Sequence, residues 1–174
     1  MGVASKKPAI TVGFDQLAPL LGKPANDRTV KAVLASSGRL SNQDSGNERY
    51  VTCKAAGFEL LIRAQRVHTI FTYSDGIRGH RGFSFPFGIT AGPRKAVLEL
   101  LGAPSGCWVM GDTAIPFTSH RADRLWVNGA SNRDAWHVDG FEVVVMSAPP
   151  VGDRARNPQR RAVVIAVEIS RPGD

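Results

Sequence analysis

Acidic side chains and a histidine gather in one irregular stretch of this 174-residue chain, a combination that can perform acid–base chemistry. Asp112, Asp123 and Asp134 fall there, with His120 among them. A pair of carboxylates beside an imidazole can exchange protons with a substrate. Aspartate is also an ordinary residue of turns, because its side chain bonds to nearby backbone amides. The structural role is the better explanation, so we predict no catalytic residues in this chain.

The other residue types that carry chemistry form no known motif. No two of the four histidines are three or four residues apart along the chain: His68, His80, His120 and His137. Cys53 and Cys107 do not form a CxxC pair, and we expect both to be reduced and buried. A serine nucleophile elbow, a zinc-protease helix and a glycine-rich phosphate loop are also missing from the sequence. We therefore predict no metal site and no cofactor.

Binding is a better-supported role than catalysis, because the chain is strongly basic. Its formal net charge is +7 and its pI is about 10.0. Arginines concentrate in two probable loops, residues 77–95 and 152–161, and tryptophans lie only in the second half. Arginine and tryptophan are frequent hot-spot residues of protein interfaces. The residues that we predict to bind a partner are Arg78, His80, Arg81, Trp108, Arg124, Trp126, Arg154, Arg156 and Arg160.

The basic charge also fits nucleic acid, which is the main alternative partner. The sequence contains no known DNA- or RNA-binding motif, and its 15 acidic residues are interspersed with the basic ones. A small enzyme is the third possibility. No apolar run approaches the length of a membrane-spanning helix, and the N-terminal residues lack the apolar core of a secretory signal. We therefore expect a cytoplasmic protein without a membrane partner.

Three segments recur in the same order along the chain. Leu20-Leu21-Gly22-Lys23-Pro24 returns as Leu100-Leu101-Gly102-Ala103-Pro104. Residues 57–62 (GFELLI) return as residues 140–145 (GFEVVV), and residues 67–74 resemble residues 163–170. Ordered self-similarity indicates one supersecondary unit written twice. We predict two α+β repeats, residues 1–75 and residues 76–174, which share one core.

Hydrophobic spacing places the elements of each repeat. In the first, one helix ends at Leu21 and another ends at Gly38, before strands over residues 50–55, 58–63 and 67–73. Residues 40–47 are predicted to be a turn. In the second, a helix buries Val97, Leu100 and Leu101, and after an irregular stretch over residues 105–134 strands follow at 136–138, 141–146 and 162–169. The fold class is α+β, with short helices packed on antiparallel β-meanders. The bridge, residues 74–88, should pack across the seam.

The bridge and the helix after it carry a recognisable pattern. A strand ending in Tyr73 precedes Gly79-His80-Arg81-Gly82-Phe83, Pro86-Phe87-Gly88-Ile89 and the helical segment from Arg94 to Ser105. This order resembles bacterial polymorphic-toxin immunity-type proteins. Members of that family often have a Trp-Asp-Arg-Tyr element in the second copy, where this chain has Asp123-Arg124-Leu125-Trp126 instead. The duplication is also similar to the tandem units of the β-lactamase inhibitor protein and of small outer-membrane assembly lipoproteins, although this chain has no lipobox.

The resemblance implies a concave sheet that grips another protein. On this basis we expect a cytoplasmic immunity protein whose partner is a cognate toxin domain. It would act by occluding the active site of the toxin, and its arginines would steer the encounter with an acidic surface. A nucleic-acid-binding accessory protein remains the alternative function.

Overall fold

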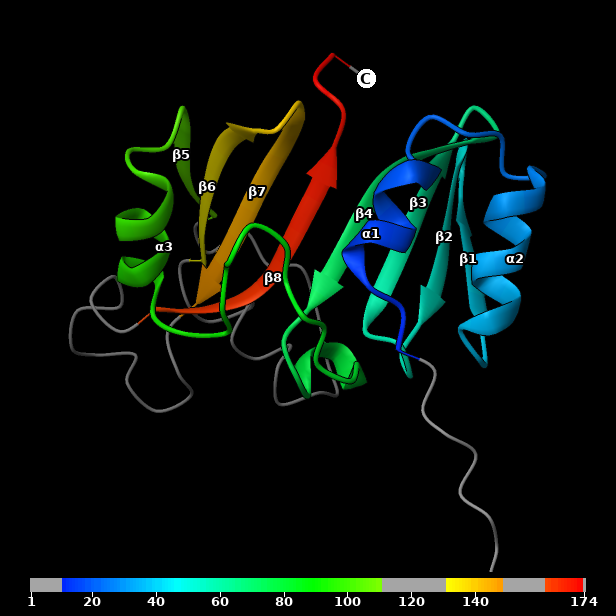
Figure 1. Cartoon of the computed structure of the whole chain (residues 1–174), viewed down its shortest axis with the longest axis horizontal. Helices are drawn as coiled ribbons and strands as arrows, with labels where there is room; N and C mark the ends of the chain where they lie inside the picture. The colour runs from blue at the N-terminus through cyan, green and yellow to red at the C-terminus, as the bar shows by residue number, and fades with distance from the viewer. Residues whose placement is uncertain (1–10, 111–130, 149–161, 174) are drawn as a thin grey trace, which may run out of the picture.

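A computed structural model describes residues 11–110, 131–148 and 162–173. It is a mixed α+β fold, with short helices and one eight-stranded sheet whose strand pairs are all antiparallel (Figure 1). The helices are α1 (Phe14–Leu17), η1 (Ala18–Leu20), α2 (Arg28–Ser36), η2 (Ile77–Gly79) and α3 (Arg94–Leu101). The strands are β1 (Ser41–Ser45), β2 (Glu48–Cys53), β3 (Phe58–Arg63), β4 (Arg66–Tyr73), β5 (Gly106–Met110), β6 (Ser131–Val138), β7 (Phe141–Ala148) and β8 (Val163–Ser170).

The strand order across the sheet is β1-β2-β3-β4-β8-β7-β6-β5. Each half therefore runs in chain order from an outer edge to the centre, and the last strands of the two halves pair with each other. That central pair extends from Thr69 opposite Ser170 to Tyr73 opposite Ala166. The backbone bonds of β4 and β8 join the halves into one sheet.

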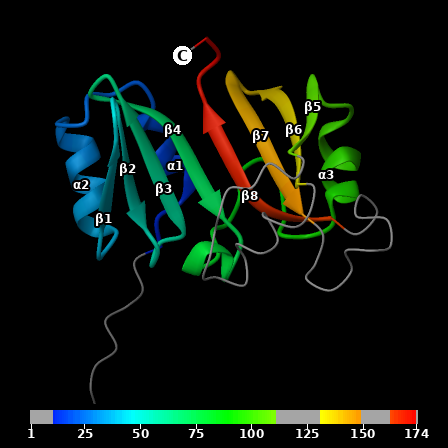
Figure 2. The same ribbon diagram turned by 180° about the vertical axis from the view of Figure 1, so that it is seen from behind.

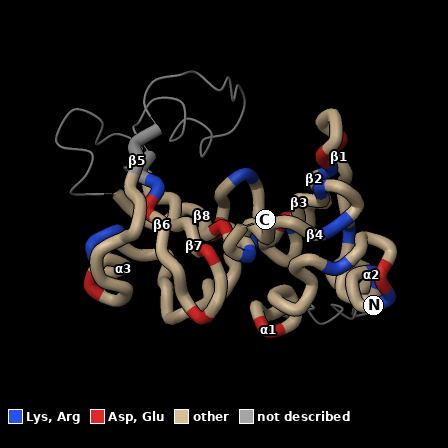
Figure 3. Tube along the Cα trace, turned by 90° about the horizontal axis from the view of Figure 1, so that it is seen from above, with Lys and Arg blue, Asp and Glu red and all other residues tan. Residues whose placement is uncertain are grey.

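The helices α1, α2 and α3 all lie on one face of the sheet. Figure 3 shows the two edges of the sheet rising away from these helices, so the opposite face is concave. Figure 2 shows the strands from that side, with the helices behind them. Apolar side chains from both halves fill the space between helices and sheet and form one cluster, which includes Leu17, Leu20, Val30, Phe58, Val145 and Val167.

The first helical segments end close to the predicted residues: η1 ends at Leu20, next to the predicted Leu21, and α2 ends at Ser36, shortly before the predicted Gly38. Asp27 caps α2, because its carboxylate accepts a hydrogen bond from the backbone N–H of Thr29. Val30 on this helix is fully buried. α1 also reaches the second half of the sheet: the ring of Phe14 packs edge-on against Phe87 of the bridge and Phe141 of β7, with centroids 5.3 and 5.8 Å away. The two halves consequently share one core.

The bridge, residues 74–88, packs across the seam as expected from its apolar content. Phe83 and Phe85 are buried in the common core. The backbone N–H of Arg81 donates to Lys54 O, and that of Phe83 donates to Tyr73 O. Gly57 permits this close approach, because a Cβ at this position would lie 2.3 Å from Arg81 O. The glycine of the GFELLI segment is thus required by packing.

Several predictions about individual segments are wrong. Residues 41–45, predicted to be part of a turn, form strand β1, and β5 lies in the stretch predicted to be irregular. Both are edge strands, and β1 is exposed along its whole length, so it has no apolar alternation to reveal it. Leu100 is 51% exposed, because α3 buries Val97 instead. Cys53 is buried, but Cys107 is exposed.

Candidate functional site

Every second side chain of each strand points toward the concave face. In β2 and β4, Val51 and Ile70 point into the core, while Tyr50 and Phe71 belong to the opposite face. Strand register sets these concave-face residues side by side: Glu59 of β3 lies opposite Phe71, and Phe71 lies opposite Glu168 of β8. Charged and aromatic groups therefore alternate across the middle of the sheet.

These side chains surround a hollow of about 330 Å³ that we call the concave pocket. It draws on both halves of the sheet and on η2. The residues that line it are Gln43, Ser45, Tyr50, Glu59, Phe71, Tyr73, Arg78, Arg133 and Met146. The rings of Tyr50 and Phe71 are 6.5 Å apart and tilted relative to each other. The pocket thus combines aromatic surface with two guanidinium groups.

A hydrogen-bonded cluster holds one wall of the concave pocket. The carboxylate of Glu59 accepts bonds from the hydroxyls of Thr52 and Tyr73, the latter at 3.4 Å. Arg78 donates to the Tyr73 hydroxyl, also at 3.4 Å. Burial and the nearby Glu59 carboxylate raise the pKa of Tyr73, so its phenol stays protonated and remains a donor. These bonds hold the side chains of the wall in place.

Arg78 reaches the concave pocket from an unusual backbone position. It sits in η2 with φ at +50°, directly after Gly76-Ile77, and Gly76 is also left-handed. A non-glycine residue pays a conformational cost for this backbone, and such residues are concentrated at functional sites. The short helix places the guanidinium within 3.4 Å of the Tyr73 hydroxyl. Sequence analysis predicted Arg78 to bind a partner; Arg78 lines this pocket, and its binding role stays a prediction.

Arg133 approaches the concave pocket from β6. Its Nη1 lies 3.9 Å from the carboxylate of Glu168, at the limit of an ion pair. Both side chains are 24% exposed. Burial is the main influence on Glu168 and raises the pKa of its carboxyl group, which opposes ionisation. Within the described residues, the ion pair between Arg133 and Glu168 is thus a long one.

The other predicted binding residues fall in different places. His80 is buried, with 3% of its surface exposed, whereas Arg81 is exposed on the bridge. Trp108 belongs to β5, and its side chain lies outside the described part of the chain. Five further predicted residues also lie outside the described residues, namely Arg124, Trp126, Arg154, Arg156 and Arg160. For those residues the prediction stands as made.

His80 has a structural position beneath the concave pocket. Its ring stacks on Tyr73 with centroids 4.1 Å apart, and its Nδ1 lies 3.1 Å from Ile77 O. Nε2 is buried without a hydrogen-bond partner in the described structure. Burial lowers the pKa of His80 to about 4, so the ring is neutral at physiological pH. It supports the wall of the pocket and exposes little surface to a partner.

Sequence reasoning missed most of the residues that line the concave pocket, Tyr50, Phe71 and Arg133 among them. The alternation of core and non-core residues in β2 and β4 is a signal that could have identified the first two, because every second residue must face away from the helices. Arg133 lies in a stretch predicted to be irregular. The strand predicted over residues 136–138 covers only the end of β6 and does not include it.

Asp134, one of the three aspartates that could perform acid–base chemistry, has a structural partner. Its carboxylate accepts two bonds from Arg94, at 2.6 and 2.8 Å, and its side chain is 1% exposed. The nearby Cys107 thiol has a raised pKa, chiefly because it hydrogen-bonds to Asp134. A raised pKa makes this cysteine a poor nucleophile. Asp134 anchors α3 to the sheet; Asp112 and Asp123 lie outside the described residues.

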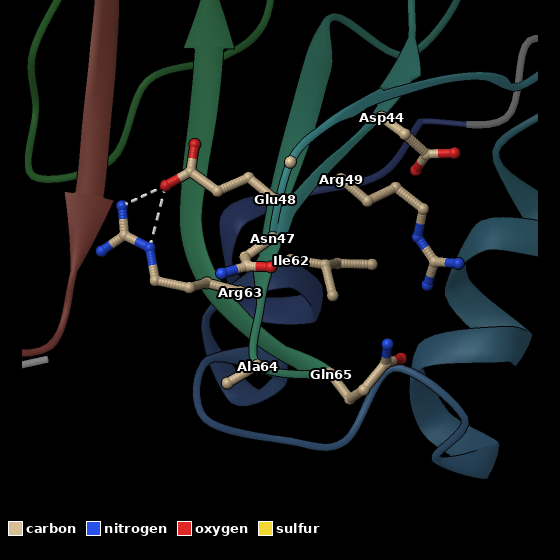
Figure 4. Close-up of a pocket in the computed structure, with 9 residues that line it drawn as sticks. Asp44, Asn47, Glu48, Arg49, Ile62, Arg63, Ala64 and Gln65 are labelled. Carbon is tan, nitrogen blue, oxygen red and sulfur yellow. Dashed lines mark hydrogen bonds and ion pairs between the residues drawn. The ribbon is translucent and has the colours of Figure 1, made fainter.

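A second hollow, of about 690 Å³, lies at the tips of the β1–β2 and β3–β4 hairpins. Figure 4 shows the ion pair between Glu48 and Arg63 on one side of the hairpin and Asp44 with Arg49 on the other. The groups that line this hollow therefore belong to both faces of the sheet and do not converge on one point. The concave pocket is the better candidate for a binding site.

No group of three potential metal ligands occurs in the described part of the chain. Within those same residues, no helix has the length and apolar character needed to cross a membrane. Comparison of the chain with protein-family models, with curated proteins and with solved structures gives no match. The geometry of the concave face is thus the basis for assigning a function.

Proposed function

We propose that this chain is a cytoplasmic immunity protein that grips a cognate toxin domain with the concave face of its sheet and blocks the toxin's active site. One observation carries the proposal. Helices cover one face of a curved sheet (Figure 3), and the opposite face holds a pocket whose lining includes aromatic and arginine side chains. Tyrosine and arginine are hot-spot residues in protein interfaces. The hydrogen-bonded wall formed by Glu59 and Tyr73 is already in place, which reduces the entropy lost on binding.

The internal duplication is part of the same proposal. Three features of the fold support it. The strand order is symmetrical about the β4–β8 pair. Gly57 and Gly140 directly precede β3 and β7 with φ values of +79° and +80°. Gly22 and Gly102, which follow the two Leu-Leu pairs, have φ values of +78° and +79°. A duplicated unit joined at its last strands doubles the width of the sheet and creates the curved surface.

A nucleic-acid-binding accessory protein is the second candidate, favoured by the net charge of +7. The pocket weighs against it, because Glu59 lines the concave pocket and Glu168 lies near it. Phosphate binding depends on concentrated positive charge, and affinity then falls steeply with salt. A gel-shift titration with random oligonucleotides at low salt separates the two functions. Tight, salt-sensitive binding supports the second candidate and contradicts the first.

The direct test of the immunity function is to look for a toxin domain in the gene immediately upstream and to co-express the chain with it. We expect the chain to rescue growth and to elute with the toxin domain from a gel-filtration column. Phe71→Ala should weaken the complex by about tenfold or more, as truncation of a central aromatic residue does in protein interfaces. The matched control is Leu100→Ala, which truncates an exposed side chain on α3, on the other face. Failure to rescue growth together with failure to form a complex would contradict the proposal.

A further inference from the structure

We propose that two copies of this chain associate through strand β1, which pairs antiparallel with β1 of the second copy about a two-fold axis at Gln43. This inference goes beyond the proposed function and does not depend on it. Among the described strands, β1 ends the sheet at one raised edge (Figure 3). All five of its residues are exposed. A strand at the edge of a sheet offers its outward N–H and C=O groups to a strand of another chain.

The hairpin that joins β1 to β2 determines which backbone groups point outward. Two residues connect the strands, the first of them Gly46 with φ at +59°, and Ser45 lies opposite Glu48. In such a hairpin the residues that flank the turn form the closing hydrogen-bonded pair. Bonded and non-bonded pairs alternate along an antiparallel ladder. The backbone groups of Asn42 and Asp44 therefore point away from β2 and are presented at the edge.

These two residues are placed symmetrically about Gln43. When two β1 strands pair antiparallel at Gln43, Asn42 of each copy lies opposite Asp44 of the other, and each such pair exchanges two backbone hydrogen bonds. Within the bounds of β1, no other antiparallel two-fold register uses the outward groups of both residues. The strand thus has one register in which it complements itself.

The side chains match in the same register. Asn42 and Asp44 lie opposite Val51 and Arg49 of β2, and Val51 is a core residue, so both side chains belong to the helix side of the sheet. Pairing at Gln43 brings the amide of Asn42 beside the carboxylate of Asp44 from the other copy. An amide N–H donates to a carboxylate in a charge-assisted hydrogen bond. Symmetry makes this bond twice, so a second copy is the partner that the edge fits.

The dimer also joins the two concave faces. Gln43 and Ser45 line the concave pocket, so Gln43 of the second copy would lie beside its rim. We expect a weak association, because one strand pair is smaller than the roughly 1,200 Å² of a stable interface, with a dissociation constant on the order of 100 µM. The net charge of +7 on each copy also opposes tight binding.

Disulfide formation tests the register directly. Cys107 is exposed and Cys53 is buried, so every variant also carries Cys107→Ser. Gln43→Cys sets two thiols across the two-fold axis, with about 4.5 Å between Cα atoms, which a disulfide can bridge. Ser41→Cys is the matched control, because Ser41 is exposed on the same strand and face, but its two copies would be about 13 Å apart. We expect Gln43→Cys to form the linked dimer at least about tenfold faster.

A charge exchange tests the same pairing without cysteines. Asn42→Asp sets carboxylates against Asp44 of the other copy and should raise the dissociation constant by about tenfold or more. Adding Asp44→Asn restores the amide–carboxylate pair in reverse order, so the double variant should return to within about threefold of wild type. Sedimentation equilibrium measures the dissociation constants, and thermal melts establish that the variants are folded.

Three results would overturn the inference. They are a wild-type monomer at concentrations up to about tenfold above the expected dissociation constant, equal rates of disulfide formation at positions 43 and 41, and a double variant that associates no better than Asn42→Asp. Hydrogen exchange identifies a different occupant of the edge. If the amides of Asn42 and Asp44 become protected only when another protein is added, the edge belongs to that protein and the dimer is contradicted.

Discussion

The two halves of the sheet are held to their helices by different forces. In the half formed by β1 to β4, the helical segments bury large apolar side chains almost completely: Leu17, Leu20, Leu21 and Val30 are each at most 1% exposed. In the half formed by β5 to β8, α3 fully buries only Val97, and Leu100 is 51% exposed. The helices of the first half are therefore held mainly by apolar packing. In the second half, apolar packing is weaker and other interactions must supplement it.

Polar bonds provide that supplement. Arg94, the first residue of α3, donates two bonds to the buried carboxylate of Asp134 in β6. Trp136 of the same strand donates from its indole Nε1 to Gly102 O, just after the helix, at 3.2 Å. Both ends of α3 are thus fixed to β6 by directional bonds. Two similar helix–sheet arrangements are thus stabilised in different ways. Burial of apolar surface dominates in the first half, and directional hydrogen bonds contribute more in the second.

The sharpest test of this contrast is to truncate Leu21 and Leu101, which hold the same position in the two Leu-Leu-Gly-x-Pro segments. Leu21→Ala removes a side chain that is 1% exposed and should lower the free energy of unfolding by about 2–5 kcal/mol. Leu101→Ala should cost about half as much, because Leu101 is only partly buried. Urea denaturation of both variants measures the difference. Equal losses would show that the two helices dock alike, contrary to our account.

The seam between the halves should respond to pH through His80. Its folded-state pKa of about 4 lies below the ordinary value of 6.5, so the unfolded chain binds the extra proton first as pH falls. Stability from the neutral, stacked ring is full above pH 6.5 and is lost between pH 6.5 and 4, by about 3 kcal/mol. His80→Phe should flatten this part of the pH profile of stability. A profile that keeps its slope in the variant would assign the dependence to other groups.

The ion pair between Arg94 and Asp134, which holds α3 to the sheet, should contribute slightly less to the free energy of unfolding than a core leucine. Asp134→Ala leaves the guanidinium of Arg94 without its partner, and we expect a loss of about 2–3 kcal/mol. The loss falls below that of a fully buried pair because the Arg94 side chain is 18% exposed and can regain water. Chemical denaturation of Asp134→Ala and of the double variant with Arg94→Met gives the coupling between the two side chains. A coupling energy near zero would show that this ion pair does not stabilise the docking of α3.

The smallest effect is expected at the exposed end of α3. Leu100→Ser replaces a side chain that is 51% exposed, so the free energy of unfolding should change by less than about 0.5 kcal/mol. Its measurement completes the comparison, because the corresponding Leu20 is fully buried. A loss above about 2 kcal/mol would mean that α3 buries a wider face than the structure shows.

The sequence predicted the elements whose burial leaves a periodic pattern. Strands β3 and β4 and helix α2 were predicted nearly to their ends, because Phe58, Ile70 and Val30 belong to regular apolar stripes. Strand β1 was missed because its stability comes from backbone pairing with β2 alone, and its side chains are polar throughout. Burial of Leu100 was predicted wrongly, since a short amphipathic helix can rotate by one residue without changing its spacing.

The candidate site was harder to predict than the fold. Arg78 was identified from charge in the bridge. Tyr73, to which it donates, lies on β4, and Arg133, which lines the same pocket, lies on β6, far along the chain. Only the central pairing of β4 with β8 brings these strands into one surface. No local pattern encodes that pairing, because antiparallel strands can follow several orders in a sheet. The pocket therefore depends on the order of the strands in the sheet, which the local sequence does not reveal.

The central claim, that the concave face binds the toxin, is tested most directly by photo-crosslinking. A benzophenone amino acid is placed at position 50, on the concave face, or at position 100, on α3, and each variant is irradiated with the purified toxin domain that co-expression identifies as the proposed partner. We predict a crosslinked complex from position 50 and none from position 100, because Tyr50 lines the concave pocket and Leu100 is exposed on α3, which covers the other face. Crosslinking from position 100 alone would place the toxin on the helices and contradict the account.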